Sequence, residues 1–204
     1  MLRMIFNFTL NYQFTTNLSH NGDDVEVIDE TKLLGTIITD DLKWHKNTES
    51  LVKRANARMR ILHKISEFSA PIEDMVTIYI SYIRSILEQS CTLWHSSLTI
   101  ENCEDLERVQ KSEMRIILKE DYQTYEQALE KLMLAKLSER REKMCLKFAK
   151  NCTKNDLTSD LFPLNPTESL GTRNKDKYRV LHANTDRLKE SAVPYLQRLL
   201  NANS

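Results

Sequence analysis

The chain has few of the residues that punctuate a many-stranded fold. It contains only three glycines and four prolines in 204 residues, and sheet-rich proteins use these two residue types at most of their turns. Hydrophobic residues make up 41% and charged residues 28% of the chain. This is enough apolar material for a modest core in one or two small domains. The composition therefore predicts a mainly α-helical protein.

The chain also lacks an excess of charge of either sign. It has 29 basic and 29 acidic residues, so a nucleic-acid surface would have to arise from where the charges lie rather than from their total. The first ten residues hold a short apolar run that Asn7 and Thr9 interrupt. That run is too short and too polar for a signal peptide or a membrane span. We therefore expect an intracellular protein without membrane contact, in the nucleus or the cytoplasm.

The residues of common metal and nucleophilic sites are scattered. The four cysteines form no Cys-x-x-Cys pair and the histidines have no partner four residues away, so no zinc site is predicted. Buried free thiols are expected instead. Asp23-Asp24 and Asp40-Asp41 are interpreted as turn residues, because Asp bonds readily to its own backbone. No catalytic residue, metal ligand or cofactor is assigned.

Short β-rich runs occupy the beginning of the chain. Residues Met4 to Phe8 and Val25 to Ile28 alternate in polarity, and Leu33 to Ile38 is a continuous β-rich run predicted as one strand. Asn21-Gly22 supplies a turn with positive φ between the first two runs. Alone, these strands would leave unpaired edges and an uncovered apolar face.

From Asn47 the apolar spacing becomes helical, and cations occupy the other faces. The apolar side is formed at steps of three and four residues by Leu51, Val52, Ala55, Met59, Leu62 and Ser66. Lys53, Arg60 and Lys64 lie opposite, with Arg54 and Arg58 on a flank. Lys and Arg are the residues that neutralise nucleic-acid phosphates without reading sequence, although a merely solvated helix face has the same pattern.

The middle of the chain predicts the helical core. Pro71 opens a helix that runs to about Glu88, and its apolar circumference places Tyr79 and Tyr82 in the core rather than against bases. Trp94 is likewise predicted to be a packing anchor. Thr99 is predicted to cap a helix over residues 101–118, and Thr124 with Gln127 forms a capping box for a shorter one.

A second basic stripe follows near the end of the chain. Its cations recur at steps of three and four residues: Arg140, Lys143, Lys147, Lys150 and Lys154. Residues 156–177 are polar and predict a linker or docking strap. A final helix is expected from about Pro194.

Several motifs in order resemble a known family. They are Leu34-Gly35, Leu42-Lys43-Trp44, Trp94-His95-Ser96-Ser97-Leu98-Thr99, Leu106-Glu107-Arg108-Val109-Gln110-Lys111, Arg115-Ile116-Ile117 and the closing run from Pro194 to Asn201. Together they are similar to the C-terminal part of reverse transcriptases of non-LTR retrotransposons of the LINE/Jockey kind. The resemblance implies a palm-end β-strand remnant (1–45), a thumb-like helical bundle (46–155) and a linker with a C-terminal tail (156–204).

The resemblance also implies a function. Leu34 and Gly35 stand where the family has its primer-gripping hairpin, and the helix from Asn47 stands where the thumb clamps the template–primer duplex. The family's catalytic carboxylates hold two divalent metals, and these residues do not occur in this chain. We therefore expect a catalytically incomplete fragment of an RNA-directed DNA polymerase that binds RNA or DNA duplex weakly and without sequence preference. Its expected contacts are Lys53, Arg54, Arg58, Arg60, Lys64, Arg140, Lys143, Lys147 and Lys150.

Other functions stay open. The apolar face of the strand remnant could instead dock on a partner or on a second copy, which would make the chain a helical interaction module. A relic without selected function is a further alternative. A 2-oxoglutarate dioxygenase or a related nucleic-acid-modifying enzyme is not favoured, because such an oxygenase needs two His and a carboxylate on iron. The chain has no His-x-Asp or His-x-Glu sequence.

Overall fold

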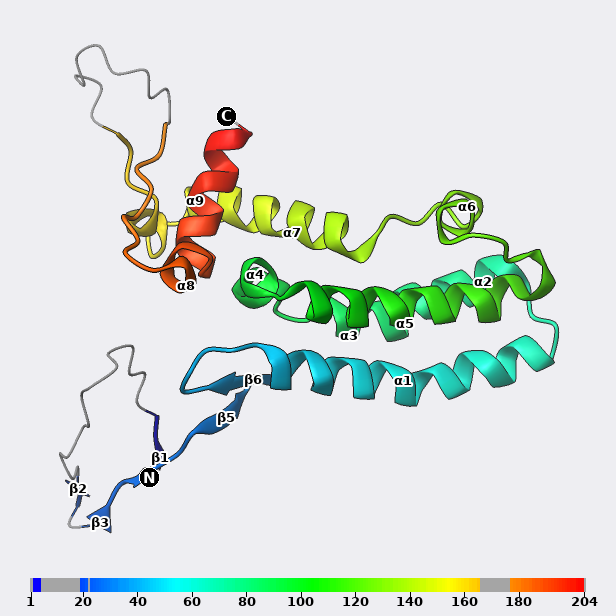
Figure 1. Ribbon diagram of the computed structural model, residues 1–204, viewed down its shortest axis with the longest axis horizontal. Helices are drawn as coiled ribbons and strands as arrows, with labels where there is room; N and C mark the ends of the chain where they lie inside the picture. Colours follow the sequence, from blue (N-terminus) through cyan, green and yellow to red (C-terminus); the bar gives the residue numbers. More distant parts are fainter. Residues whose placement is uncertain (1, 5–18, 22, 166–176, 204) are drawn as a thin grey trace.

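The computed structural model describes residues 2–4, 19–21, 23–165 and 177–203, and helices dominate it (Figure 1). This confirms the predicted mainly helical fold with short strands at its beginning. The longer helices are α1 (His45–Glu67), α5 (Ile100–Leu118), α7 (Leu137–Cys152) and α9 (Ala192–Ala202). Figure 1 shows α1 and α5 side by side, with α7 on the other side of α5 and α9 against α7.

Shorter helical elements connect these four. They are α2 (Ile72–Ile78), η1 (Tyr79–Arg84), α3 (Ser85–Leu87), α4 (Cys91–Trp94), η2 (His95–Ser97), η3 (Lys119–Asp121), α6 (Tyr125–Lys131), η4 (Ser159–Leu161) and α8 (Asp186–Lys189). The Thr99 and Thr124 hydroxyls accept hydrogen bonds from the backbone N–H of Asn102 and Gln127. Both predicted caps are therefore confirmed.

The strands form small two-stranded pairs. β1 (Leu2–Arg3) pairs in parallel with β4 (Glu26–Val27), and β2 (Ser19–His20) pairs with β3 (Asp23–Asp24) in antiparallel register. Asn21, between β2 and β3, has a φ of 54° as predicted for a turn, while Gly22 and most of the predicted strand from Met4 to Phe8 lie outside the described residues. Asp23-Asp24 belongs to a strand, not to the turn that was predicted.

The prediction of one continuous strand over Leu33 to Ile38 is wrong. β5 (Glu30–Leu33) and β6 (Thr36–Thr39) form an antiparallel hairpin in which Leu33 pairs with Thr36. The two connecting residues, Leu34 and Gly35, have φ values of 48° and 85°. Positive φ at both positions is the type I′ geometry that matches the twist of a tight hairpin, so the glycine breaks a run whose composition favours extension.

The hairpin packs on the helical body. The Ile37 N–H donates to Asn47 Oδ1 at 3.0 Å, and Gln89 Nε2 donates to the Leu34 carbonyl at 3.0 Å. Trp44, which links β6 to α1, packs against the main hydrophobic core. The hairpin is therefore fixed relative to α1 and to the end of α3.

The main core lies between α1, the α2–η1–α3 segment, α5 and α6. Its buried members include Leu51, Leu62, Tyr79, Ile83, Trp94, Leu106 and Met114. The core positions predicted for Tyr79 and Trp94 are thus confirmed. The core position predicted for Tyr82 is wrong, because its ring lies at the surface under the guanidinium of Arg58.

A π-helical turn interrupts the helix that follows Pro71. α2, η1 and α3 form one continuous helical segment, and η1 has the wider π-helical winding. The adjacent residues Ile83 and Arg84, at the end of η1, are both buried. π-helical turns occur frequently at functional sites.

The end of the chain contributes a second, smaller core. Cys145, Ala149 and Cys152 of α7 pack with Phe162 and with the apolar face of α9, formed by Leu196, Leu199 and Leu200. α9 begins two residues before the predicted Pro194, and residues 166–176 of the predicted linker lie outside the described part. Cys91, Cys145 and Cys152 are buried free thiols and Cys103 is half-buried, as predicted.

Candidate nucleic-acid interface

A row of exposed cations follows the face of α1 that points away from the core. Lys53, Arg60 and Lys64 are exposed, and positions seven and eleven residues apart return to the same line of a helix within about 40°. Glu49 and Glu67 are the acidic residues of α1. Within the described part of the chain, none of the three cations forms an ion pair. Their charges are therefore available to an external anion.

Arg54 and Arg58 of α1 have partners inside the molecule. Arg54 Nη2 donates to Gln89 Oε1 at 2.8 Å, and Arg58 Nη1 donates to the Tyr82 carbonyl at 2.6 Å. The Arg58 guanidinium also lies 4.0 Å from the centroid of the Tyr82 ring. These two residues of the predicted set thus attach α1 to the α2–η1–α3 segment and its following turn.

The second predicted stripe, on α7, also contains both exposed cations and a cation that is bonded within the molecule. Lys143, Lys147 and Lys150 of α7 are exposed, and no ion pair engages them in the described segments. Arg140, by contrast, donates from Nε and Nη2 to the two carboxylate oxygens of Glu88, at 2.6 and 3.2 Å. Because α5 lies between α1 and α7 (Figure 1), the two lysine-bearing faces are separate surfaces.

The β5–β6 hairpin turn lies beside the residues that follow α3. The Leu34 carbonyl accepts from Gln89, whose Oε1 accepts from Arg54. A Cβ added to Gly35 would lie 2.4 Å from Gln89 Nε2, so glycine permits this close approach. The structure thus brings the predicted primer-grip-like residues next to Arg54.

Sequence reasoning missed Arg141, the most buried charged side chain of α7. It is 0% exposed, its guanidinium lies 5.8 Å from the Trp94 ring centroid, and its Nε is 3.5 Å from His95 Nδ1. Burial first and the Arg141 charge second lower the pKa of His95 to about 4, so this imidazole is neutral at physiological pH. The sequence does contain a signal for the burial of Arg141, because Arg141 lies four residues after Leu137 and four before Cys145 on the apolar stripe.

Asp40 and Asp41 form the turn that was predicted for them. Asp41 Oδ1 accepts from Thr39 Oγ1 at 2.7 Å and from the Lys43 N–H at 3.0 Å. Partial burial opposes ionisation, but these hydrogen bonds and the Lys43 charge outweigh it and lower the pKa of Asp41 to about 2. Across the described residues, no group of His, Cys, Asp and Glu has an arrangement that could hold a metal ion.

We expect the purified chain to show no primer extension with Mg²⁺ or Mn²⁺. Phosphoryl transfer of this type needs two metals that stabilise the attacking and leaving oxygens, and positioning by cations cannot replace them. The measurement is incorporation of labelled nucleotide on a primed template, compared with a blank without protein. Incorporation above the blank would contradict the expectation that this chain is catalytically incomplete.

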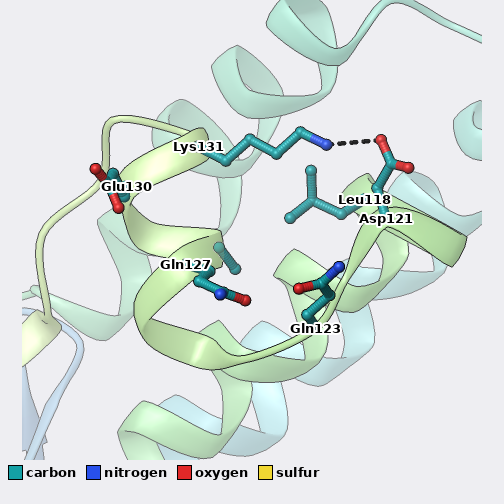
Figure 2. Close-up of a pocket in the computed structure, with 7 residues that line it drawn as sticks. Leu118, Asp121, Gln123, Gln127, Glu130 and Lys131 are labelled. Carbon is teal, nitrogen blue, oxygen red and sulfur yellow. Dashed lines mark hydrogen bonds and ion pairs between the residues drawn. The ribbon is translucent and has the colours of Figure 1, made fainter.

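A shallow pocket lies at the other end of the molecule, between η3 and α6. Its volume is about 310 Å³, and its lining includes Asp121, Gln123, Gln127 and Lys131. Figure 2 shows Lys131 reaching across the pocket to Asp121, and Nζ and Oδ2 are 2.6 Å apart. The lining carries two carboxylates, Asp121 and Glu130, and one cation, Lys131, so the pocket does not extend the basic surface of α1.

Comparison with protein-family models, with curated proteins and with solved structures finds no match for this chain. In the described part, no helix combines the length and apolar character that crossing a membrane requires.

Proposed function

We propose that this chain is the thumb-like part of a reverse-transcriptase-derived protein and that α1 holds a nucleic-acid duplex through its phosphates. The observation that supports this most strongly is the row of Lys53, Arg60 and Lys64, exposed and without ion-pair partners among the described residues. From Lys53 to Lys64 the helix rises about 16 Å. That length matches roughly five base steps of about 3.4 Å each.

This surface provides charge but no means of reading bases. Lysine and arginine contacts to phosphate fix position and contribute affinity, whereas sequence is read by hydrogen bonds to base edges. The formal net charge of zero keeps long-range attraction small. The proposed binding is therefore weak, independent of sequence and dependent on salt.

The test compares two charge-reversal variants of equal size. Lys53→Glu/Arg60→Glu/Lys64→Glu changes the α1 face, and Lys143→Glu/Lys147→Glu/Lys150→Glu makes the same change in charge on α7. Fluorescence anisotropy with a labelled duplex should show binding lost in the α1 variant and largely kept in the α7 variant. Equal losses would mean that overall charge, not the α1 face, attracts the duplex.

The hairpin supports a second candidate function, self-association. Leu33 and Leu34 are 59% and 89% exposed at the turn of a two-stranded sheet, and exposed apolar strand edges favour pairing with another chain. If this is the main function, sedimentation velocity should show a concentration-dependent dimer that Leu33→Ser/Leu34→Ser abolishes. A monomer at all concentrations would exclude it.

A further inference from the structure

Three arginines from different elements converge on the turn that follows α3. Arg84 comes from the end of η1, Arg140 from α7 and Arg54 from α1. Glu88 Oε1 lies 2.6 Å from Arg140 Nε and 3.8 Å from Arg84 Nε. The next residue, Gln89, accepts from Arg54 at 2.8 Å.

Positive charge in this cluster is only partly compensated. Glu88 is the one carboxylate that acts on both Arg84 and Arg140 among the described groups. Burial first, and then the repulsion from Arg140, lower the pKa of Arg84. Arg54 reaches the next residue, Gln89. Counted together, the formal charges of the three arginines and Glu88 sum to an excess of about two positive charges, which a phosphate monoester with a charge of about −1.5 to −2 would offset.

Donors in the cluster also lack acceptors. Arg84 Nε and Arg54 Nη1 are buried and have no hydrogen-bond partner within the described part of the molecule, and the Arg84 side chain is only 10% exposed. Buried donors without partners are rare in folded proteins, because each one costs its desolvation energy. Guanidinium groups match phosphate oxygens in both charge and geometry, so an incoming phosphate would satisfy these donors.

The cluster reaches solvent through Arg140 of α7. The Arg140 side chain is 33% exposed, and the hairpin turn at Leu34 and Gly35 forms the neighbouring wall through Gln89. Glu88 and Gln89 hold part of each guanidinium group. Arg84 Nε and Arg54 Nη1 stay without a hydrogen-bond partner among the described residues. The site is also distinct from the exposed α1 row, which Arg54 flanks.

We propose that Arg54, Arg84 and Arg140 form a binding site for a single phosphate monoester, next to the β5–β6 hairpin turn. The phosphate group belongs either to a nucleic-acid strand end or to a small phosphorylated molecule, and both present the same dianion. Phosphate binding at this site does not depend on the proposed binding of duplex by α1.

The first arm of the test uses inorganic phosphate, titrated into the full chain and followed by calorimetry against sodium chloride of equal ionic strength. We expect saturable binding that Arg140→Gln weakens about tenfold or more, because it removes a charge-assisted contact. Arg140→Lys should recover part of the loss. Lys189→Gln, which removes an exposed cation on α8, is the control and should bind as the unmodified chain does.

The second arm identifies the source of the phosphate. A duplex with 5′-phosphates should bind more tightly than the same duplex with 5′-hydroxyls if strand ends are the ligand, and Arg140→Gln should remove the difference. Equal binding of the two duplexes, with phosphate binding retained, assigns the site to a small phosphorylated molecule. Lys53→Glu/Arg60→Glu/Lys64→Glu should still bind inorganic phosphate, which separates this proposal from that for α1. Absence of saturable phosphate binding, or an equal loss in Lys189→Gln, would overturn the site.

Discussion

Replacing Ile83 with alanine should lower the free energy of unfolding by about 2 to 5 kcal/mol, the range for removing a large aliphatic side chain from a packed core. Ile83 is fully buried on η1 and belongs to the main core. Because Ile83 lies among other buried core side chains, its truncation leaves a cavity that adds to the loss of apolar burial. Because small domains are only marginally stable, this loss should move the midpoint of urea unfolding to a much lower urea concentration. Circular dichroism measures the midpoint.

Ile61→Ala provides the matched control. Ile61 is on α1 with an exposed side chain, so the same substitution should change the midpoint little, and alanine's higher helix propensity offsets part of the loss. Similar costs at both positions would mean that the core between α1, α5 and the α2–η1–α3 segment does not have the proposed packing.

Replacing Glu113 with glutamine should remove a marked pH dependence of stability. Glu113 is fully buried on α5, and neither carboxylate oxygen has a hydrogen-bond partner in the part that the structure describes. Burial raises the pKa of Glu113 from 4.5 to about 8. The folded chain therefore holds the Glu113 proton more tightly than the unfolded chain does, and the stabilisation present in acid is lost as pH rises from about 4.5 to about 8.

Between pH 5.5 and pH 8 the expected loss of stability is on the order of 3 kcal/mol, since each pH unit inside the shifted interval corresponds to about 1.4 kcal/mol. Urea unfolding at pH 5.5 and pH 8 should show it in the unmodified chain and not in Glu113→Gln. Glu104→Gln, an exposed position of the same helix, should keep the dependence. If the dependence survives in Glu113→Gln, Glu113 is ionised in the folded chain or has a partner.

Much of the helical framework follows from local signals. The spacing of apolar residues predicted the long helices and the core positions of Tyr79 and Trp94, and the Thr99 and Thr124 side chains marked helix starts. These features depend on residues within one or two helical turns. For the same reason, they are readable without knowing what each helix packs against.

The buried charges were missed because their environment is tertiary. Glu113 lies four residues from Val109 and from Ile117, so the apolar stripe of α5 passes directly over it. A charged residue on such a stripe is usually interpreted as a boundary of the buried face, not as part of it. Glu113 and Arg141 show instead that the stripe continues through them.

The candidate interface was predictable only in part. Spacing correctly separated the exposed Lys53, Arg60 and Lys64 from the flanking Arg54 and Arg58. It could not reveal that Arg54 reaches Gln89 or that Arg140 reaches Glu88, since these partners are distant in sequence. Composition alone missed the turn within Leu33 to Ile38, because β-rich neighbours masked the positive φ at Leu34 and Gly35, whereas the resemblance implied a hairpin at these two residues.

The salt dependence of duplex binding tests the central proposal most directly. If Lys53, Arg60 and Lys64 contact phosphates, the logarithm of the association constant should fall linearly with the logarithm of salt concentration, with a slope that these contacts steepen by about 0.9 each. The neutral variant Lys53→Gln/Arg60→Gln/Lys64→Gln removes these contacts without adding repulsion, so its slope should be shallower by roughly 3, with helix content unchanged by circular dichroism. An unchanged slope in that variant would show that the α1 face is solvated and binds no duplex.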